Sequence, residues 1–106
     1  MRRDVVVAEP AEQQLRIVDD WWRRNRLAAT DLFAVEFASA IDMLATHPGV
    51  SAPVPRRKFK GLRRFLLRST RYHVYYVATD RVVTVLAVWS AVRGSGPPIA
   101  ALSPTE

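Results

Sequence analysis

The chain has 106 residues, of which 49% are hydrophobic and 25% charged, so it is long enough for one domain with a modest core and is unlike a disordered protein. It has no cysteine and only two histidines, which excludes disulfides and argues against a zinc site made of protein ligands alone. Its formal net charge of +6 implies attraction to nucleic acid, to an acidic protein or to an anionic surface.

Membrane insertion and export are not expected. No apolar run reaches the about 18 residues that a membrane span needs. The apolar run at residues 5–8 is also too short for the core of a signal peptide. We therefore expect a cytoplasmic protein with no membrane partner, no metal ion and no cofactor.

The first half of the chain predicts one strand followed by two helices. Residues 4–8 are rich in β-branched side chains and end at a Glu-Pro pair, which is typical of a short buried strand. A helix over residues 10–24 is predicted by an apolar stripe, Ala11, Leu15, Val18 and Trp22. A second stripe predicts a helix over residues 28–46, and its members are Phe33, Phe37, Ala40 and Leu44.

The second half predicts a loop and then three strands. Residues 50–60 contain two prolines and show no periodicity, which is typical of a loop. Strands are predicted at residues 62–69, 72–78 and 82–89, with a hairpin turn at residues 79–81. Residues 1–96 would form the single domain, and residues 97–106 a partly disordered tail.

The order β-α-α-β-β-β predicts an α+β fold. The two helices are joined by a short connection, so they should form an N-terminal helical hairpin. Each helix has one apolar stripe, and both stripes can be buried together on one face of a small, mostly antiparallel sheet. The other face of the sheet is expected to be free.

Charge is divided unevenly along the chain. No acidic residue lies between Met43 and Thr79, whereas half of the 16 Lys and Arg residues do: Arg56, Arg57, Lys58, Lys60, Arg63, Arg64, Arg68 and Arg71. One interpretation is a solvated loop and edge strand whose cations discourage aggregation. The alternative is a functional electropositive surface, which we favour because a merely solvated face usually interleaves both signs.

Strand alternation divides the basic stretch between two faces. In residues 62–69, Phe65 and Leu67 would point towards the helices. Arg64, Leu66 and Arg68 would then point towards the free face. A one-residue bulge in this strand would reverse the assignment.

Alternation also places His73 on the free face, because Tyr72, Val74 and Tyr76 form the more apolar side of their strand. Nearby arginines would disfavour the imidazolium form there and leave a base at neutral pH. The alternative is a structural histidine that is hydrogen-bonded between strands.

Trp21 and Trp22 are neighbours in the first helix, so only one of the rings can join the apolar stripe. The other is turned away by about 100°. It could anchor a partner or cover the edge of the core.

Four segments carry a resemblance to a known family: VVVAEPAEQQLRIVDDWW, FAVEFASAIDMLATHPG, FKGLRRFLLRSTRYHVYYV and VVTVLAVWSAVRG. In this order they resemble the RelE/ParE superfamily of toxins from bacterial type II toxin–antitoxin modules, over about residues 5–93. The family fold, two N-terminal helices on an antiparallel sheet, agrees with the order predicted from periodicity. The resemblance implies a toxin that inhibits growth and is neutralised by an acidic antitoxin, with which it would form a hetero-oligomer.

The resemblance implies one of two targets. RelE-like members cleave messenger RNA in the ribosome, and ParE-like members bind and poison DNA gyrase. In either case the electropositive surface would bind the antitoxin or the target, through Arg56, Arg57, Lys58, Lys60, Arg64, Leu66, Arg68, Arg71 and Arg93. The cationic set of the ribonuclease branch is matched by Lys58, Lys60, Arg68 and Arg93, with His73 as a candidate assistant.

Two departures from the ribonuclease branch favour the ParE-like interpretation. The tail contains no tyrosine, and Ser90 stands where many relatives have a histidine. We therefore expect a gyrase inhibitor without catalytic residues of its own. The alternative is a RelE-like, ribosome-dependent mRNA endonuclease, and a third hypothesis is a non-toxic remnant that acts only in complex with its antitoxin.

Overall fold

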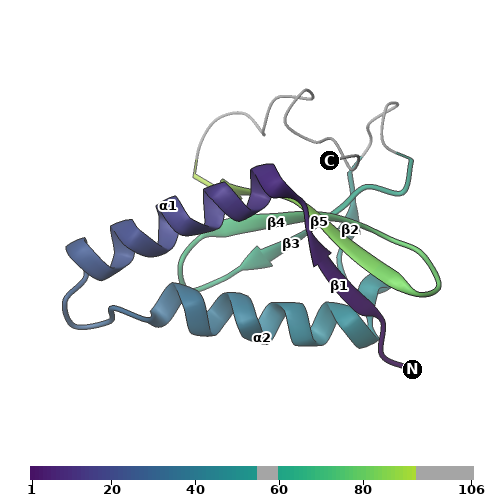
Figure 1. The fold of residues 1–106 in the computed structure, drawn as a ribbon, viewed down its shortest axis with the longest axis horizontal. Coiled ribbons are helices and arrows are strands. Elements are labelled where there is room, and N and C mark those ends of the chain that lie inside the picture. Colours follow the sequence, from purple (N-terminus) through teal and green to yellow (C-terminus); the bar gives the residue numbers. More distant parts are fainter. Residues whose placement is uncertain (55–59, 93–106) are drawn as a thin grey trace.

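The computed structural model describes residues 1–54 and 60–92 (Figure 1). In chain order its elements are β1 (Asp4–Val7), α1 (Glu9–Asn25), α2 (Leu32–Thr46), the 3-10 helix η1 (Pro48–Val50), β2 (Ala52–Pro53), β3 (Arg63–Leu67), β4 (Tyr72–Ala78) and β5 (Val82–Ser90). The strands form one sheet in the order β1-β5-β4-β3-β2, in which β1 is parallel to β5 and the other pairs are antiparallel. The predicted α+β fold is confirmed.

The helical hairpin covers one face of the sheet (Figure 1). The predicted stripes meet there: Ala11 of α1 and Phe33 and Leu44 of α2 are fully buried, and Trp22 packs against them. The sheet contributes the side predicted from alternation, namely Phe65, Leu67, Tyr72, Val74 and Tyr76, together with Val83, Val85 and Val88. The prediction that Phe65 and Leu67 face the helices is therefore confirmed.

The second helix begins at Leu32, so the prediction that it starts at residue 28 is wrong. The chain uses residues 26–32 for two successive tight turns, in which the Ala29 amide donates to the Arg26 carbonyl (2.9 Å) and the Leu32 amide to the Ala29 carbonyl (3.2 Å). Asp31 then occupies the N-cap position. The reversal after α1 takes precedence over the helical propensity of the two alanines.

The loop predicted over residues 50–60 contains the end of η1 and the two-residue strand β2. Pro53 belongs to β2, which lies at the edge of the sheet, where a missing amide hydrogen need not interrupt the ladder. Residues 55–59, and the tail predicted over residues 97–106, lie outside the described residues.

The prediction that the face opposite the helices is free is wrong. This face carries a second small core that includes Leu62, Tyr75, Leu86 and Ala87, with Trp89 packed against it. A bulge in β5 contributes to it. Tyr75 pairs with Ala87 and Tyr76 with Val85, so Leu86 is an extra residue. The bulge lets Leu86 and its neighbour both belong to this second core, which regular alternation would not allow.

Candidate functional site

The β3–β4 hairpin brings several of the predicted site residues together. In its ladder Arg64 pairs with Tyr75 and Leu66 with His73, and His73 pairs in turn with Trp89 of β5. Directly paired residues share a face, so Leu66, His73 and Trp89 form a row across three strands on the side away from the helices. Arg64 is exposed beside this row, and Leu66 and His73 are half-buried.

The turn of this hairpin adds two exposed cations, Arg68 and Arg71. Arg71 has a φ of 66°, in the left-handed region, and its amide donates to the Leu67 carbonyl (2.8 Å). Arg68 follows Leu67, the last residue of the ladder, so alternation does not determine its direction. Arg68 lines a groove beside α2, described below, and the prediction that it shares a face with Arg64 is not supported by the ladder.

The remaining predicted cations are more distant or not described. Lys60 is exposed in the turn that precedes β3. Arg56, Arg57, Lys58 and Arg93 lie outside the described residues.

The hairpin cations differ from those of the helices in their partners. Arg16, Arg23 and Arg24 of α1 each pair with a carboxylate one turn earlier, and Arg2 pairs with Asp42. Within residues 1–54 and 60–92, no such pair includes a cation of the β3–β4 hairpin. The positive charge of the hairpin therefore remains available to an acidic or anionic partner.

The surroundings of His73 favour its neutral form. Burial lowers the pKa of His73, and the positive charges of Arg64 and Arg71 lower it further. Its ring makes an edge-to-face contact with Tyr75, with 6.0 Å between the ring centroids. The predicted effect of the arginines on His73 is thus present, and the side chain can act as a base or hydrogen-bond acceptor at neutral pH.

A carboxylate that the sequence analysis missed organises the hairpin turn. Glu36 of α2 accepts hydrogen bonds from the Ser69 amide (2.8 Å), the Thr70 amide (3.0 Å) and the Thr70 hydroxyl (2.7 Å). Burial acts to raise the pKa of Glu36, but the hydrogen bonds from Ser69 and Thr70 outweigh it, and the net shift is downward. The sequence contained one sign of this role: Glu36 is an acidic residue between Phe33 and Phe37, next to the apolar stripe of the second helix.

A groove separates α2 from the outer edge of β3. It has a volume of about 190 Å³ and is lined by Glu36, Ser39, Ala40, Met43, Phe65, Leu66, Leu67 and Arg68; we call it the edge groove. A second hollow of about 450 Å³, lined by Met43, His47, Gly49 and Val50, adjoins it at Met43. Met43 is 45% exposed and Val50 55% exposed, which is high for large apolar side chains.

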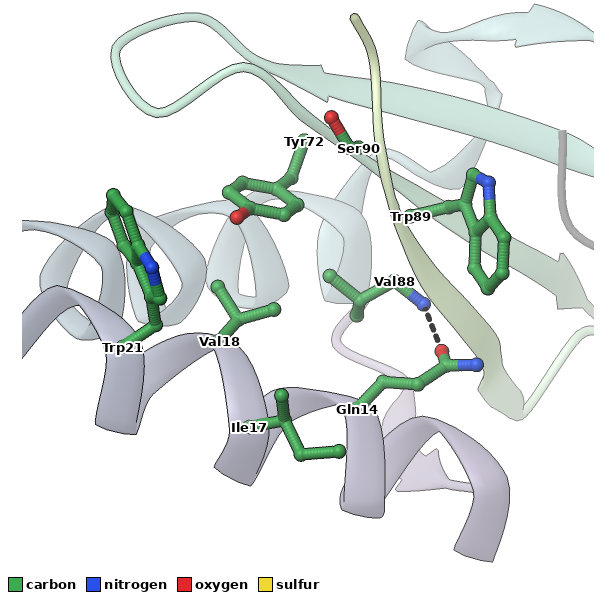
Figure 2. Close-up of a pocket in the computed structure, with 8 residues that line it drawn as sticks. All are labelled: Gln14, Ile17, Val18, Trp21, Tyr72, Val88, Trp89 and Ser90. Carbon is green, nitrogen blue, oxygen red and sulfur yellow. Dashed lines mark hydrogen bonds between the residues drawn. The ribbon is translucent and has the colours of Figure 1, made fainter. Parts of the chain in front are cut away.

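A further groove lies between α1 and β5 (Figure 2). It measures about 280 Å³ and is lined by Gln14, Ile17, Val18, Trp21, Tyr72, Val88, Trp89 and Ser90; we call it the α1–β5 groove. The Val88 amide donates to Gln14 Oε1 (2.7 Å), drawn as the dashed line in Figure 2. Trp21 is 42% exposed with the Arg26 guanidinium 5.0 Å from its ring centroid, whereas Trp22 packs in the core. The prediction that only one of the two rings joins the core is confirmed.

The described residues were also searched for a metal site and for a membrane-spanning helix. Among residues 1–54 and 60–92, no three His, Asp or Glu side chains are grouped so that they could hold a metal ion. Neither helix in this part of the chain is long and apolar enough to cross a membrane.

Comparison with known proteins identifies the class of protein. A family model described as the ParE toxin of the type II toxin-antitoxin system, parDE, matches residues 5–93. The chain therefore belongs to the ParE toxin family, and the predicted membership of the RelE/ParE superfamily, on the ParE side, is confirmed. It is a toxin of the type II toxin–antitoxin class.

A solved structure shares the fold. It is described as the chromosomal ParDE TA system from P. aeruginosa, and one of its chains is 14% identical to this one with a TM-score of 0.66. The match covers 84% of this chain and 96% of that chain. No match was found among curated proteins.

Proposed function

We propose that this protein inhibits growth by binding and poisoning DNA gyrase, and that an acidic antitoxin neutralises it. The observation that carries the proposal is the match of the ParE toxin family over residues 5–93. The cations of the β3–β4 hairpin form no ion pair with a described residue, and this agrees with the proposal, because such cations suit an acidic segment of a protein partner.

In this proposal one surface serves both partners. Arg64, Leu66, Arg68 and Arg71 combine positive charge with one large apolar side chain, and Lys60 lies in the turn that precedes β3. An amphipathic acidic segment of the antitoxin that covers these residues would exclude gyrase from them. Neutralisation is then competition for a surface and needs no change in the fold.

The test is expression of the chain alone, with two readouts in parallel. The proposal predicts gyrase-trapped DNA breaks, DNA-damage signalling and filamentation while translation is initially intact. Arg68→Glu should reduce toxicity, and Arg24→Glu is its matched control, because it changes the charge equally on a side chain that pairs with Asp20 (2.9 Å). Toxicity without gyrase-trapped DNA breaks, together with a rapid loss of translation, would contradict the proposal.

The second candidate function is cleavage of messenger RNA in the ribosome, and one observation favours it. Burial, and then the positive charges of Arg64 and Arg71, lower the pKa of His73, which suits a base that takes a proton from a ribose hydroxyl near a phosphate. Arg68 would bind the phosphate, with Lys58, Lys60 and Arg93 completing the cationic set. This candidate predicts cut messages that disappear in His73→Ala and Arg68→Ala.

A third outcome would rule out both gyrase and ribosome-bound messenger RNA as the target. If expression of the chain alone causes no growth defect, while the chain still binds its antitoxin, the protein is a non-toxic remnant that acts only in that complex.

A further inference from the structure

The α1–β5 groove has an exposed apolar rim on α1. Ile17 and Trp21 lie one helical turn apart, so they share a side of the helix, and they are 70% and 42% exposed. Figure 2 shows them on α1, across the groove from Tyr72 and Val88 of the sheet. Exposed apolar side chains occur singly on most protein surfaces, whereas a group around one groove is typical of a contact with another molecule.

Trp21 is fixed in position although it is exposed. The guanidinium carbon of Arg26 lies 5.0 Å from the centroid of the Trp21 ring and 5.6 Å from that of the Trp22 ring. The two indole rings also meet edge to face, with 5.8 Å between their centroids. An ordered side chain loses little conformational freedom when a partner covers it, and tryptophan is among the residues that contribute most to protein contacts.

The groove suits a helix better than a strand. β1 pairs with β5 only as far as Val85, so the following part of β5 borders the groove. There the Val88 amide donates to Gln14 Oε1 (2.7 Å), so it is not offered to an added strand. A helix needs no backbone bond to its partner and can place apolar side chains against Ile17 and Trp21.

The charges of α1 make a second copy of the same helix a suitable partner. Its first turn is acidic, with Glu9 and Glu12, and its last turn is basic, with Arg23 and Arg24. Ile17 is the middle residue of this helix, which spans residues 9–25. Two copies of α1 that cross antiparallel at Ile17 therefore bring the acidic end of each to the basic end of the other.

An acidic segment of another protein is less suited to this groove. Among the described residues, none that lines the groove is charged, so the groove does not select carboxylates. The cations Arg64 and Arg68 lie in and directly after β3, which is two strands away from β5 in the sheet. Repulsion between the hairpins of two copies therefore does not act at this contact.

We propose that two copies of this chain form a symmetric dimer in which the α1 helices pack antiparallel over the α1–β5 grooves. Ile17 lies at the two-fold axis, and Trp21 of each copy packs on the first half of α1 in the other copy. The inference goes beyond the proposed function and does not depend on it, because it requires neither gyrase nor an antitoxin.

The first experiment is sedimentation velocity of the free, whole chain over a range of concentrations, which should show a monomer–dimer equilibrium. Ile17→Glu should weaken the dimer by at least about tenfold, because the two-fold axis brings two carboxylates together in an apolar contact. Val35→Glu is the matched control, since Val35 of α2 is also a helix residue and is 60% exposed, and it should leave the dissociation constant within about twofold. The melting temperatures of both variants check that the fold is kept.

A second experiment tests the two-fold axis itself. The chain has no cysteine, so the thiol of Ile17→Cys can form a disulfide only with another copy. Oxidation by dissolved oxygen should link Ile17→Cys into a dimer, because the axis brings the two Cα atoms within the about 7 Å that a disulfide spans. Val35→Cys, treated in the same way, should remain unlinked.

The outcomes separate this dimer from other uses of the groove. A free chain that stays monomeric at every concentration would overturn the inference. A dimer that Ile17→Glu and Val35→Glu weaken equally, or that Ile17→Cys does not link, would have its contact elsewhere, and the inference would again be wrong. If the chain is monomeric and Ile17→Glu instead weakens its complex with the protein encoded by the neighbouring reading frame, the groove holds that protein. None of these results involves gyrase, so the proposed function is tested separately.

Discussion

Replacing Glu36 by alanine removes the acceptor that holds the β3–β4 turn on α2. Three hydrogen bonds end on this carboxylate, from the amides of Ser69 and Thr70 and from the Thr70 hydroxyl, at 2.7–3.0 Å. Charge-assisted bonds of this kind are stronger than bonds between neutral groups. Glu36→Ala therefore tests how strongly the cationic turn is fixed by the helical hairpin.

The expected loss of stability depends on which of the three donors can form a hydrogen bond to water once the Glu36 carboxylate is removed. Thr70 is only 6% exposed, so its amide and hydroxyl would lose their acceptor in a largely dry environment, at about 1–3 kcal/mol for an unsatisfied buried donor. Ser69 is exposed, and its amide can be hydrated. We expect Glu36→Ala to lower the free energy of unfolding by about 2–4 kcal/mol, which is about 8–16 °C in melting temperature for a domain of this size.

Urea unfolding and thermal melts measure this, with Asp42→Ala as the control. Asp42 is also a carboxylate of α2, but its ion pair with Arg2 (2.6 Å) joins side chains that are 74% and 58% exposed. Such a pair contributes about 0–1 kcal/mol, so Asp42→Ala should have little effect. Equal losses in the two variants would refute the reasoning.

The pH dependence of the same comparison gives an independent check. The folded-state pKa of Glu36 is lowered by its hydrogen bonds, against the effect of burial, so its stabilisation is present above its ordinary value of 4.5. The stabilisation is lost as the pH falls through the folded-state pKa. The stability difference between the wild type and Glu36→Ala should therefore be largest near neutral pH and shrink below about pH 4.5; a difference that is constant down to pH 2 would contradict a role for the ionised carboxylate.

Three smaller effects can be measured alongside. Arg71→Gly should raise the free energy of unfolding by about 0.5–1 kcal/mol, because φ is 66° there, whereas Arg71→Ala should not; equal effects would show that the gain is not conformational. Tyr76→Phe should lower it by about 1–2 kcal/mol in urea unfolding, since the fully buried hydroxyl donates to the Pro48 carbonyl. NMR titration of the His73 ring should give a pKa below 6.5, and Arg64→Ala should raise this pKa by removing a nearby positive charge. An unchanged pKa in Arg64→Ala would show that the Arg64 charge does not affect His73.

The pattern of the sequence predicted the helix-facing side of β3 and β4 correctly, for a physical reason. Both strands pair in an unbroken register from Arg63–Tyr76 to Leu67–Tyr72, so simple alternation applies to Phe65, Leu67 and Val74. The predicted strand ends were less accurate, because Arg68 belongs to the turn although its neighbours are strand-forming.

Other features could not be predicted because they depend on contacts between distant residues. The bulge at Leu86 arises where β5 must fit β4, and an apolar strand sequence contains no mark of it. The bonds between Glu36 and Thr70 join residues 34 positions apart. β2 has two residues, which is too few to show any periodicity. It is a strand only because Ala52 pairs with Arg64 of β3.

The described cations of α1 and of the β3–β4 hairpin differ in the acidic residues around them. On α1 each described arginine at positions 16, 23 and 24 lies four residues after an acid, which neutralises the helix locally. On the hairpin, cations are concentrated where the sequence has no acid nearby, and Glu36 accepts hydrogen bonds from the turn backbone and from the Thr70 hydroxyl. Among the described residues, Glu36 forms no ion pair with a cation. Like charges concentrated on one hairpin repel one another in the free protein. A partner that brings carboxylates to Arg64 and Arg68 relieves that repulsion, so binding should stabilise the hairpin as well as cover it.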